Sequence, residues 1–222
     1  MKLIINNDIK NKIKDFNVTA YHIVFDDNYN ALTKDSNVDK LLLDVTQFLQ
    51  QKYNYDDITQ ISKLKETRDG YKILGKDPSH TRCASEALLR RIIKGNNLYR
   101  LGDVIDLGNI LSVLTLRSVC VVDYNKLQGD VEIRLGTKDD IFYGINRGII
   151  NVTSMPIYQD ELSPFGSPTS DTLRTMVTVN TKEILVMIIN FSNNDIKEDE
   201  ETLISLYQKY TKIKYLEKLG EE

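Results

Sequence analysis

The chain has 222 residues, of which 41% are apolar and 27% charged, with a formal net charge of −3. That length allows one large domain or two small ones with a real core, while the negative charge argues against bulk electrostatic binding of nucleic acid. No apolar run approaches the roughly 18 residues that a bilayer requires, and the N-terminus predicts no cleavable leader. The two cysteines match no disulfide framework, so we expect a soluble, cytoplasmic protein.

The first sixty residues predict a mixed α/β segment. Residues 17–25 (NVTAYHIVF) are rich in β-formers and largely apolar on both faces, which predicts a buried strand. We interpret His22 on this strand as a core histidine with a hydrogen-bond partner. Ser36 begins a helix whose apolar residues recur at helical spacing, and a shorter helix follows from about residue 56.

Residues 71–94 (YKILGKDPSHTRCASEALLRRIIK) predict a turn that leads directly into a basic amphipathic helix. Arg90, Arg91 and Lys94 gather at the C-terminal end of this helix, where cations suit the helix dipole. Residues 61–100 hold ten Lys/Arg and four Asp/Glu, a balance of +6 within an acidic chain. A local contact with phosphate groups explains this pattern, and a solvated helix face explains it equally well.

The rest of the chain predicts one further helix, then strands, then a last helix. Mid-helix Gly108 predicts close packing of the helix that begins at Asp103. The apolar period then shifts to two, and the last helix takes residues 199–219. We predict strands at 119–124, 130–136, 141–145, 148–154 and 183–191. The intervening residues 161–175 (ELSPFGSPTSDTLRT) are too polar and too rich in Gly, Pro and Ser for a regular element, which is typical of functional or mobile loops.

Familiar cofactor and metal patterns are missing from the sequence. It contains neither GxGxxG nor GxxxxGK[ST], so we expect no nucleotide cofactor. No CxxC or HxxxH spacing occurs, so we expect no metal site. Cys83 at a helix N-terminus near His80 is a candidate nucleophile, but a small buried packing residue is the interpretation that we favour.

The 161–175 loop is the best candidate for ligand binding. It offers hydroxyls, a carboxylate and a guanidinium, which together can grip a carboxylate, a ribose or another polar ligand. The alternative is a surface loop held together by its own Ser/Thr and Asx turns. We favour a ligand role, with contributions from Ser167, Thr169, Ser170, Asp171 and Arg174.

Several segments together resemble one family. GKDPSHTRCASEALLRRIIKGN, DLGNILSVLTLRSVCVVDY, GSPTSDTLRT and EILVMIIN are similar to the tRNA-binding and editing domain of the phenylalanyl-tRNA synthetase beta subunit, in a free-standing bacterial form. The resemblance covers about residues 71–190. It implies an α+β fold, a layered β/β/α sandwich. We expect a single domain over 1–222, with an N-terminal mixed segment at 1–70, an editing-domain-like core at 71–191 and a C-terminal helix at 192–222.

The resemblance also implies site residues. Asn109 in DLGNIL matches the asparagine of the family motif DVTNYV, and Cys120 in SVCVVD stands where the family has a histidine that lines the editing pocket. The family's pocket glutamate has no confident counterpart. The family domain hydrolyses the ester of mischarged tyrosyl-tRNA, so the departure at Cys120 implies that hydrolysis here is organised differently or is missing. The chain lacks an aminoacylation core and should not act as a tRNA ligase.

Three functional hypotheses follow. The first is a trans-acting aminoacyl-tRNA deacylase, whose partner is the aminoacylated 3′ end of tRNA. The second is a non-catalytic RNA-binding module, and the third is an amino-acid-binding protein. For the first we assign catalysis to Asn109 and Asp171, substrate contacts to Cys120, Ser167, Thr169, Ser170 and Arg174, and RNA contacts to Arg82, Arg90, Arg91 and Lys94.

Overall fold

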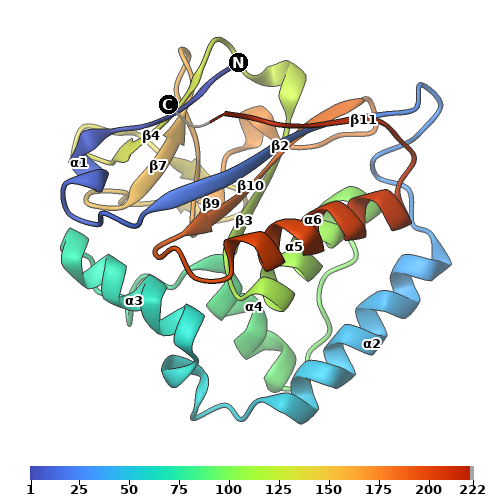
Figure 1. Cartoon of the computed structure of the whole chain (residues 1–222), viewed down its shortest axis with the longest axis horizontal. Coiled ribbons are helices and arrows are strands. Elements are labelled where there is room, and N and C mark those ends of the chain that lie inside the picture. The colour runs from blue at the N-terminus through green and yellow to red at the C-terminus, as the bar shows by residue number, and fades with distance from the viewer. Residues whose placement is uncertain (221–222) are drawn as a thin grey trace.

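The computed structural model describes residues 1–220, which form two β-sheets and a set of helices (Figure 1). The four-stranded sheet has the order β11-β2-β10-β3, and all its neighbouring strands are antiparallel. Its strands are β2 (Asn17–Phe25), β3 (Ser118–Asp123), β10 (Glu183–Asn190) and β11 (Ile213–Lys218).

The five-stranded sheet has the order β1-β4-β7-β8-β9, in which β1 and β4 are parallel and the other neighbours antiparallel. Its strands are β1 (Leu3–Ile5), β4 (Val131–Leu135), β7 (Pro156–Gln159), β8 (Pro164–Ser167) and β9 (Ser170–Asp171). A two-residue hairpin pair, β5 (Tyr143–Gly144) and β6 (Gly148–Ile149), is joined to the end of β9 by a bridge between Gly144 and Thr172.

The longer helices lie on the side of the four-stranded sheet that faces away from the five-stranded one (Figure 1). They are α2 (Ser36–Lys52), α3 (Ser62–Leu74), α4 (Ala84–Ile93), α5 (Asp103–Thr115) and α6 (Ile196–Tyr210). The single-turn helix α1 (Asn7–Lys10) lies beside the five-stranded sheet, and three 3-10 turns occupy Ile58–Gln60, Tyr124–Lys126 and Leu173–Thr175.

Gly108 sets the distance between the helices and the sheet. A Cβ at this position on α5 would clash with the side chain of Val121 on β3, which is the close packing that the mid-helix glycine predicts. Since neighbouring residues of a strand face opposite sides, Val121 faces α5 and Cys120 faces the five-stranded sheet. The layers are therefore β/β/α, and the predicted α+β class is confirmed.

Strand β10 is the centre of the core. It pairs with β2 along one edge and with β3 along the other, and every residue from Ile184 to Asn190 is buried. A strand covered on both faces favours a continuous apolar run, which is what the sequence EILVMIIN provides. One contiguous apolar cluster extends from Leu3 to Tyr207 and joins both sheets to the helices.

The C-terminal segment corrects the predicted 199–219 helix. The helix α6 ends at Tyr210, where the hydroxyl of Thr211 donates to the carbonyl of Tyr207. Residues Ile213–Lys218 then form β11 along the free edge of β2. The apolar spacing of the helix stops at Tyr210, but the pairing partner of the next residues lies almost 200 positions away and is invisible to local periodicity.

The 161–175 segment was expected to be irregular, and this is corrected in part. It contains β8, β9 and a 3-10 turn at Leu173–Thr175. These strands are only four and two residues long, which is too short for a clear β-pattern in the sequence. They form because β8 pairs with β7 and β9 pairs with β8. Among residues 1–220, no helix is long and apolar enough to cross a membrane.

Candidate functional site

The site is built on the tight β8–β9 hairpin. The hydroxyl of Ser167 donates to the carbonyl of Ser170 (3.0 Å) and accepts from the backbone amides of Thr169 (3.3 Å) and Ser170 (3.2 Å). This is a self-contained turn of the kind that Ser favours. The hydroxyl of Ser167 is therefore used in shaping the hairpin and not in facing a ligand.

The tip of this hairpin is fixed to the start of α4 and of β3. The carbonyl of Pro168 accepts from the backbone amide of Ala84 (2.7 Å) and from the hydroxyl of Ser118 (3.0 Å). The hydroxyl of Thr169 donates to the carbonyl of Arg82 (3.1 Å). Two segments that are about 85 residues apart in the chain, the polar loop and the basic helix, thus lie in direct contact.

Asp171 is the last residue of the hairpin strand β9 and is half-buried. Gly166 makes room for it, because a Cβ there would lie 2.8 Å from Asp171 Oδ1. Burial raises the pKa of Asp171 to about 7, and only the hydrogen bond from the thiol of Cys120 opposes that rise. No cation contacts this carboxylate among residues 1–220. The group therefore exchanges its proton near neutral pH, as a general acid or base requires.

The buried thiol of Cys120 and the buried phenol of Tyr158 lie near this carboxyl group. Burial raises the pKa of the Cys120 thiol well above its ordinary value, and the neighbouring carboxylate of Asp171 adds to that rise. The fully buried Tyr158 on β7 has its pKa raised by burial, with smaller contributions from Cys120, Tyr71 and Asp171. Its hydroxyl has no hydrogen-bond partner among the described residues. We call Asp171, Cys120, Tyr158 and Tyr71 the Asp171 group.

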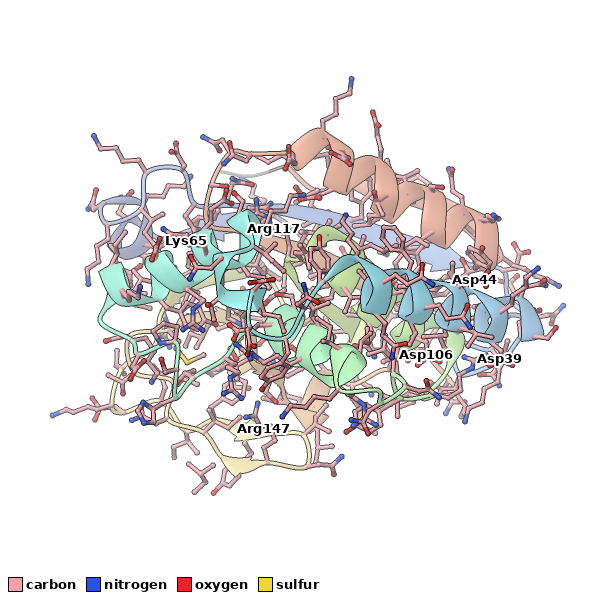
Figure 2. The ribbon with its side chains drawn as sticks, turned by 90° about the horizontal axis from the view of Figure 1, so that it is seen from below. Asp39, Asp44, Lys65, Asp106, Arg117 and Arg147 are labelled. Atoms are coloured by element: carbon pink, nitrogen blue, oxygen red, sulfur yellow. The ribbon has the colours of Figure 1, made fainter. Side chains whose placement is uncertain are left out.

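Two further residues close the site on the hairpin side. The hydroxyl of Tyr71 lies 3.4 Å from that of Thr169. Arg147, on the loop between β5 and β6, donates to the carbonyl of Thr169 (3.1 Å) and lies at the edge of the molecule (Figure 2). The hairpin is thus held from the core by a tyrosine and from the surface by an arginine.

Arg174 does not belong to this group. Its guanidinium donates to both oxygens of the buried Asp160 (2.8 and 3.1 Å) and to the carbonyls of Ser163 and Lys126. These four bonds tie the end of β9 to the loops on either side of it. Two of the three guanidinium nitrogens are thereby bound to protein acceptors, and Nε has no partner among the described residues. These bonds give Arg174 a structural role, and the ligand contact expected of it stays a prediction.

Asn109 also lies apart from Asp171. It is the neighbour of Gly108 on α5, in the helical layer, whereas Cys120 and Asp171 lie between the two sheets. The four-stranded sheet therefore separates Asn109 from Asp171. Asn109 therefore does not lie with Cys120 and Asp171, the residues with which the predicted site grouped it, because α5 packs on the opposite face of the four-stranded sheet.

The predicted RNA-contacting cations lie on α4 and just beyond its two ends, and they differ in how far other residues already bind them. The carboxylate of Glu86 is 1% exposed and is contacted by Arg68 (2.9 Å), Arg90 (2.8 Å) and Arg82 (3.8 Å). Arg90 is largely committed to this buried pair. Arg82 and Lys94 are exposed and Arg91 is half-buried at the surface, so these three are the more available cations.

Cys83 behaves as a packing residue. Its thiol is buried, lies 3.3 Å from the hydroxyl of Ser85, and has its pKa raised by burial. His80 pairs with Asp77 at the surface instead. His22 is 14% exposed in its side chain, contacts Glu183 at 2.8 Å and stacks on Tyr124. Among residues 1–220, no group of three or more His, Cys, Asp or Glu side chains is arranged to hold a metal ion.

A family model, that of the B3/4 domain, matches residues 66–209, well over half of the chain. The protein belongs to the B3/4 domain family. No curated protein matches the sequence. Among solved structures, an N-terminal fragment of the phenylalanyl-tRNA synthetase beta subunit from Pyrococcus horikoshii is similar, with 8% identity and a TM-score of 0.51. The similarity covers 99% of this chain and 54% of that one, so the chain spans about half the length of the fragment and shares its fold.

The B3/4 match includes the whole Asp171 group and α4, but it begins after α2. Sequence reasoning did not assign Tyr158 and Tyr71 to the site. Both tyrosines have apolar neighbours in the sequence and therefore look like ordinary core residues. A tyrosine in the short run PIYQ next to a polar loop is the one local signal for Tyr158, because buried tyrosines normally find a partner for the hydroxyl.

Proposed function

We propose that this B3/4 domain binds the aminoacylated 3′ end of tRNA in the cytoplasm and hydrolyses mischarged aminoacyl-tRNA in trans. One observation carries the proposal: a carboxyl group with a pKa of about 7 lies on a hairpin that is bonded directly to a basic helix. The similar fold of the synthetase fragment supports the choice of ligand.

In this mechanism the carboxylate of Asp171 takes a proton from a water molecule as the water oxygen attacks the ester carbonyl carbon. The bond between that carbon and the ribose oxygen then breaks, and the ribose oxygen leaves with the proton that Asp171 had accepted. The thiol of Cys120 orients the carboxylate through its hydrogen bond. The unpartnered hydroxyl of Tyr158 supplies a polar contact for the substrate side chain, since polar pairing discriminates better than apolar fit.

The test is a deacylation assay with purified protein, tyrosyl-tRNA and a panel of other mischarged tRNAs. We expect hydrolysis above the buffer rate for at least one of them. Asp171→Asn should lower that rate by about 100-fold or more, whereas the exposed Asp139→Asn should leave it unchanged. Absence of hydrolysis across the panel would overturn the proposal.

The second candidate is a non-catalytic RNA-binding module. It is favoured by Cys120, a buried thiol that cannot replace a histidine in proton transfer, together with the exposed cations of α4. This function predicts RNA affinity that falls steeply with salt and that drops in Arg91→Gln and Lys94→Gln. Two results together would select this candidate. The wild type would bind tRNA without hydrolysing it, and the Asp171→Asn variant would bind tRNA as tightly as the wild type.

A further inference from the structure

The C-terminal ends of α2 and α4 meet at one surface of the molecule. The side-chain amide of Gln50 donates to the carbonyl of Ile92 at 2.9 Å and holds the two ends together. Cations and aromatic rings interleave around this junction. We call the following eight residues the cation–aromatic cluster: Phe48, Lys52, Tyr53, Tyr55, Arg90, Arg91, Lys94 and Tyr99.

Five of the six cation–π contacts between residues 1 and 220 lie in this cluster. Arg91 lies 4.0 Å from the ring centre of Tyr99 and also donates to its hydroxyl (3.0 Å). Arg90 and Lys94 both lie 4.9 Å from the ring centre of Tyr55. Such a concentration on one surface is more than random surface pairing provides, because these contacts occur about once per 70–80 residues.

Three of the four rings of the cluster project from the surface, whereas Tyr53 is half-buried and packs against the core. Phe48 is 50% exposed, Tyr99 is 53% exposed and Tyr55 is 36% exposed. Exposed aromatic side chains gain nothing from the hydrophobic effect in the free protein. Each ring nevertheless has a cation beside it. The cation holds the ring in a fixed orientation, on which a planar group such as a nucleotide base could stack.

The charge of the cluster suits an anion. Lys52, Arg91 and Lys94 supply three positive charges, whereas Arg90 is paired with the buried carboxylate of Glu86, which Arg68 also contacts. Asp56 and Asp57 follow Tyr55 in the chain and are the opposing charges closest in sequence. Aromatic rings interleaved with cations are the arrangement by which proteins hold unpaired nucleotides, with rings against bases and cations against phosphates.

We propose that the cation–aromatic cluster binds unpaired RNA nucleotides, with bases stacked on Tyr99 and Tyr55 and phosphates paired with Lys94, Arg91 and Lys52. The inference rests on the proposed function for its ligand class and adds a second contact region to it. Phe48, Lys52, Tyr53 and Tyr55 precede residue 66, so half of the cluster lies outside the B3/4 match and belongs to this chain's own N-terminal segment.

The spacing fits a single-stranded 3′ end. The ten residues of α4 span about 15 Å, with the cluster at one end and the hairpin of Asp171 bonded to the other. Nucleotides stacked in one strand rise by about 3.4 Å each, so about four of them cover this distance. The terminal, aminoacylated nucleotide would then reach Asp171 while the preceding unpaired nucleotides lie along α4.

The experiment is fluorescence anisotropy with a labelled 12-nucleotide single-stranded RNA and a duplex of the same sequence. We expect the wild type to prefer the single strand. Tyr99→Leu should weaken its binding between fivefold and about 100-fold, which corresponds to the loss of one stacked base, and Lys94→Gln should reduce the salt dependence. Tyr99→Phe, which retains the ring, should bind like the wild type.

Matched controls lie on β11, where Tyr215→Leu and Lys214→Gln remove an exposed ring and an exposed cation of the same kinds. Unchanged single-strand affinity in Tyr99→Leu and Lys94→Gln, or equal losses in the β11 variants, would overturn the inference. The deacylation assay separates the two proposals. If deacylation is found but its KM is unchanged in Tyr99→Leu, this inference fails alone; if there is no deacylation but the cluster variants lose RNA affinity, the proposed activity fails alone.

Discussion

The Arg117 network and the carboxyl group of Asp171 differ in how the protein treats a charged group that is removed from water. Arg117, at the start of β3, is fully buried and lies inside the fold (Figure 2). It contacts Glu66 at 2.8 Å and Asp199 at 3.6 Å, and Lys63 pairs with Asp199 at 2.7 Å. Asp171 has no cation partner within the described residues, and the thiol of Cys120 and the unpartnered phenol of Tyr158 lie near it.

The difference indicates different roles. A buried ion network with matched charges ties α3, the start of β3 and α6 together. A buried carboxyl group without a cation destabilises the folded state when it is ionised, and such an arrangement persists where the chemistry of the site requires it. We therefore interpret the Arg117 network as structural and the Asp171 group as the reactive part of the fold.

The largest effect should come from breaking the Arg117 network. Arg117→Met leaves Glu66 and Asp199 partly or fully buried without their shared cation, so we expect a loss of about 3–5 kcal/mol in the free energy of unfolding. Denaturant unfolding measures it. The matched control Lys197→Met removes an exposed cation from α6 and should change stability by less than about 0.5 kcal/mol. Equal effects in the two variants would contradict the structural role.

The Asp171 carboxyl group should make the folded protein less stable as the pH rises. Below about pH 4 the carboxyl group is protonated in both the folded and the unfolded state. As the pH rises from about 4 to about 7, the unfolded chain loses this proton and the folded protein keeps it, so stability falls, and it levels off above pH 7. Asp171→Asn should remove this slope. Denaturant unfolding at several pH values measures it, and an unchanged slope in the variant would refute the raised pKa.

The rate of deacylation should also depend on the ionisation of Asp171, but it should rise with pH where stability falls. A general base works in its ionised form, so the rate of deacylation should rise as the pH increases through about 7 and reach a plateau above it. Initial rates between pH 5.5 and 8.5, on a substrate corrected for spontaneous hydrolysis, measure this. A flat profile would exclude Asp171 as the base.

A smaller loss is expected from the second cation of the structural network. Lys63→Met removes one partner of Asp199, but Arg117 remains to compensate that carboxylate. We expect a destabilisation of about 1–3 kcal/mol, below that of Arg117→Met. Additive losses in the double variant would show that the two cations act independently, which the shared carboxylate argues against.

The smallest change concerns the hydrogen bond between Cys120 and Asp171. A hydroxyl donates more strongly than a thiol, so Cys120→Ser should lower the pKa of Asp171 by less than about one unit and shift the midpoint of the rate profile to lower pH. Stability should change little, because the two side chains are nearly the same size. A shift to higher pH would show that the thiol does not donate to this carboxylate.

The sequence determined most of the longer helices and the central strands, and it predicted the basic helix α4 to which we assign part of the proposed RNA contact. Helical spacing predicted α2, α4 and α5, the apolar run EILVMIIN predicted β10, and the mid-helix Gly108 predicted its close contact with the sheet. Local charge counting found the basic helix α4. These features depend on residues that lie within a turn or a strand of each other, and such short-range patterns survive into the folded state.

Only the tertiary structure decided which polar residues share a site. It placed Asn109 and Cys120 on opposite sides of one sheet, paired Arg174 with Asp160, and brought Cys120 and Tyr158 close to Asp171. It also turned the predicted end of the last helix into β11. Each of these outcomes depends on partners 14 to about 190 residues away in the chain, and on the face of a strand or helix that packing buries, neither of which a local pattern contains.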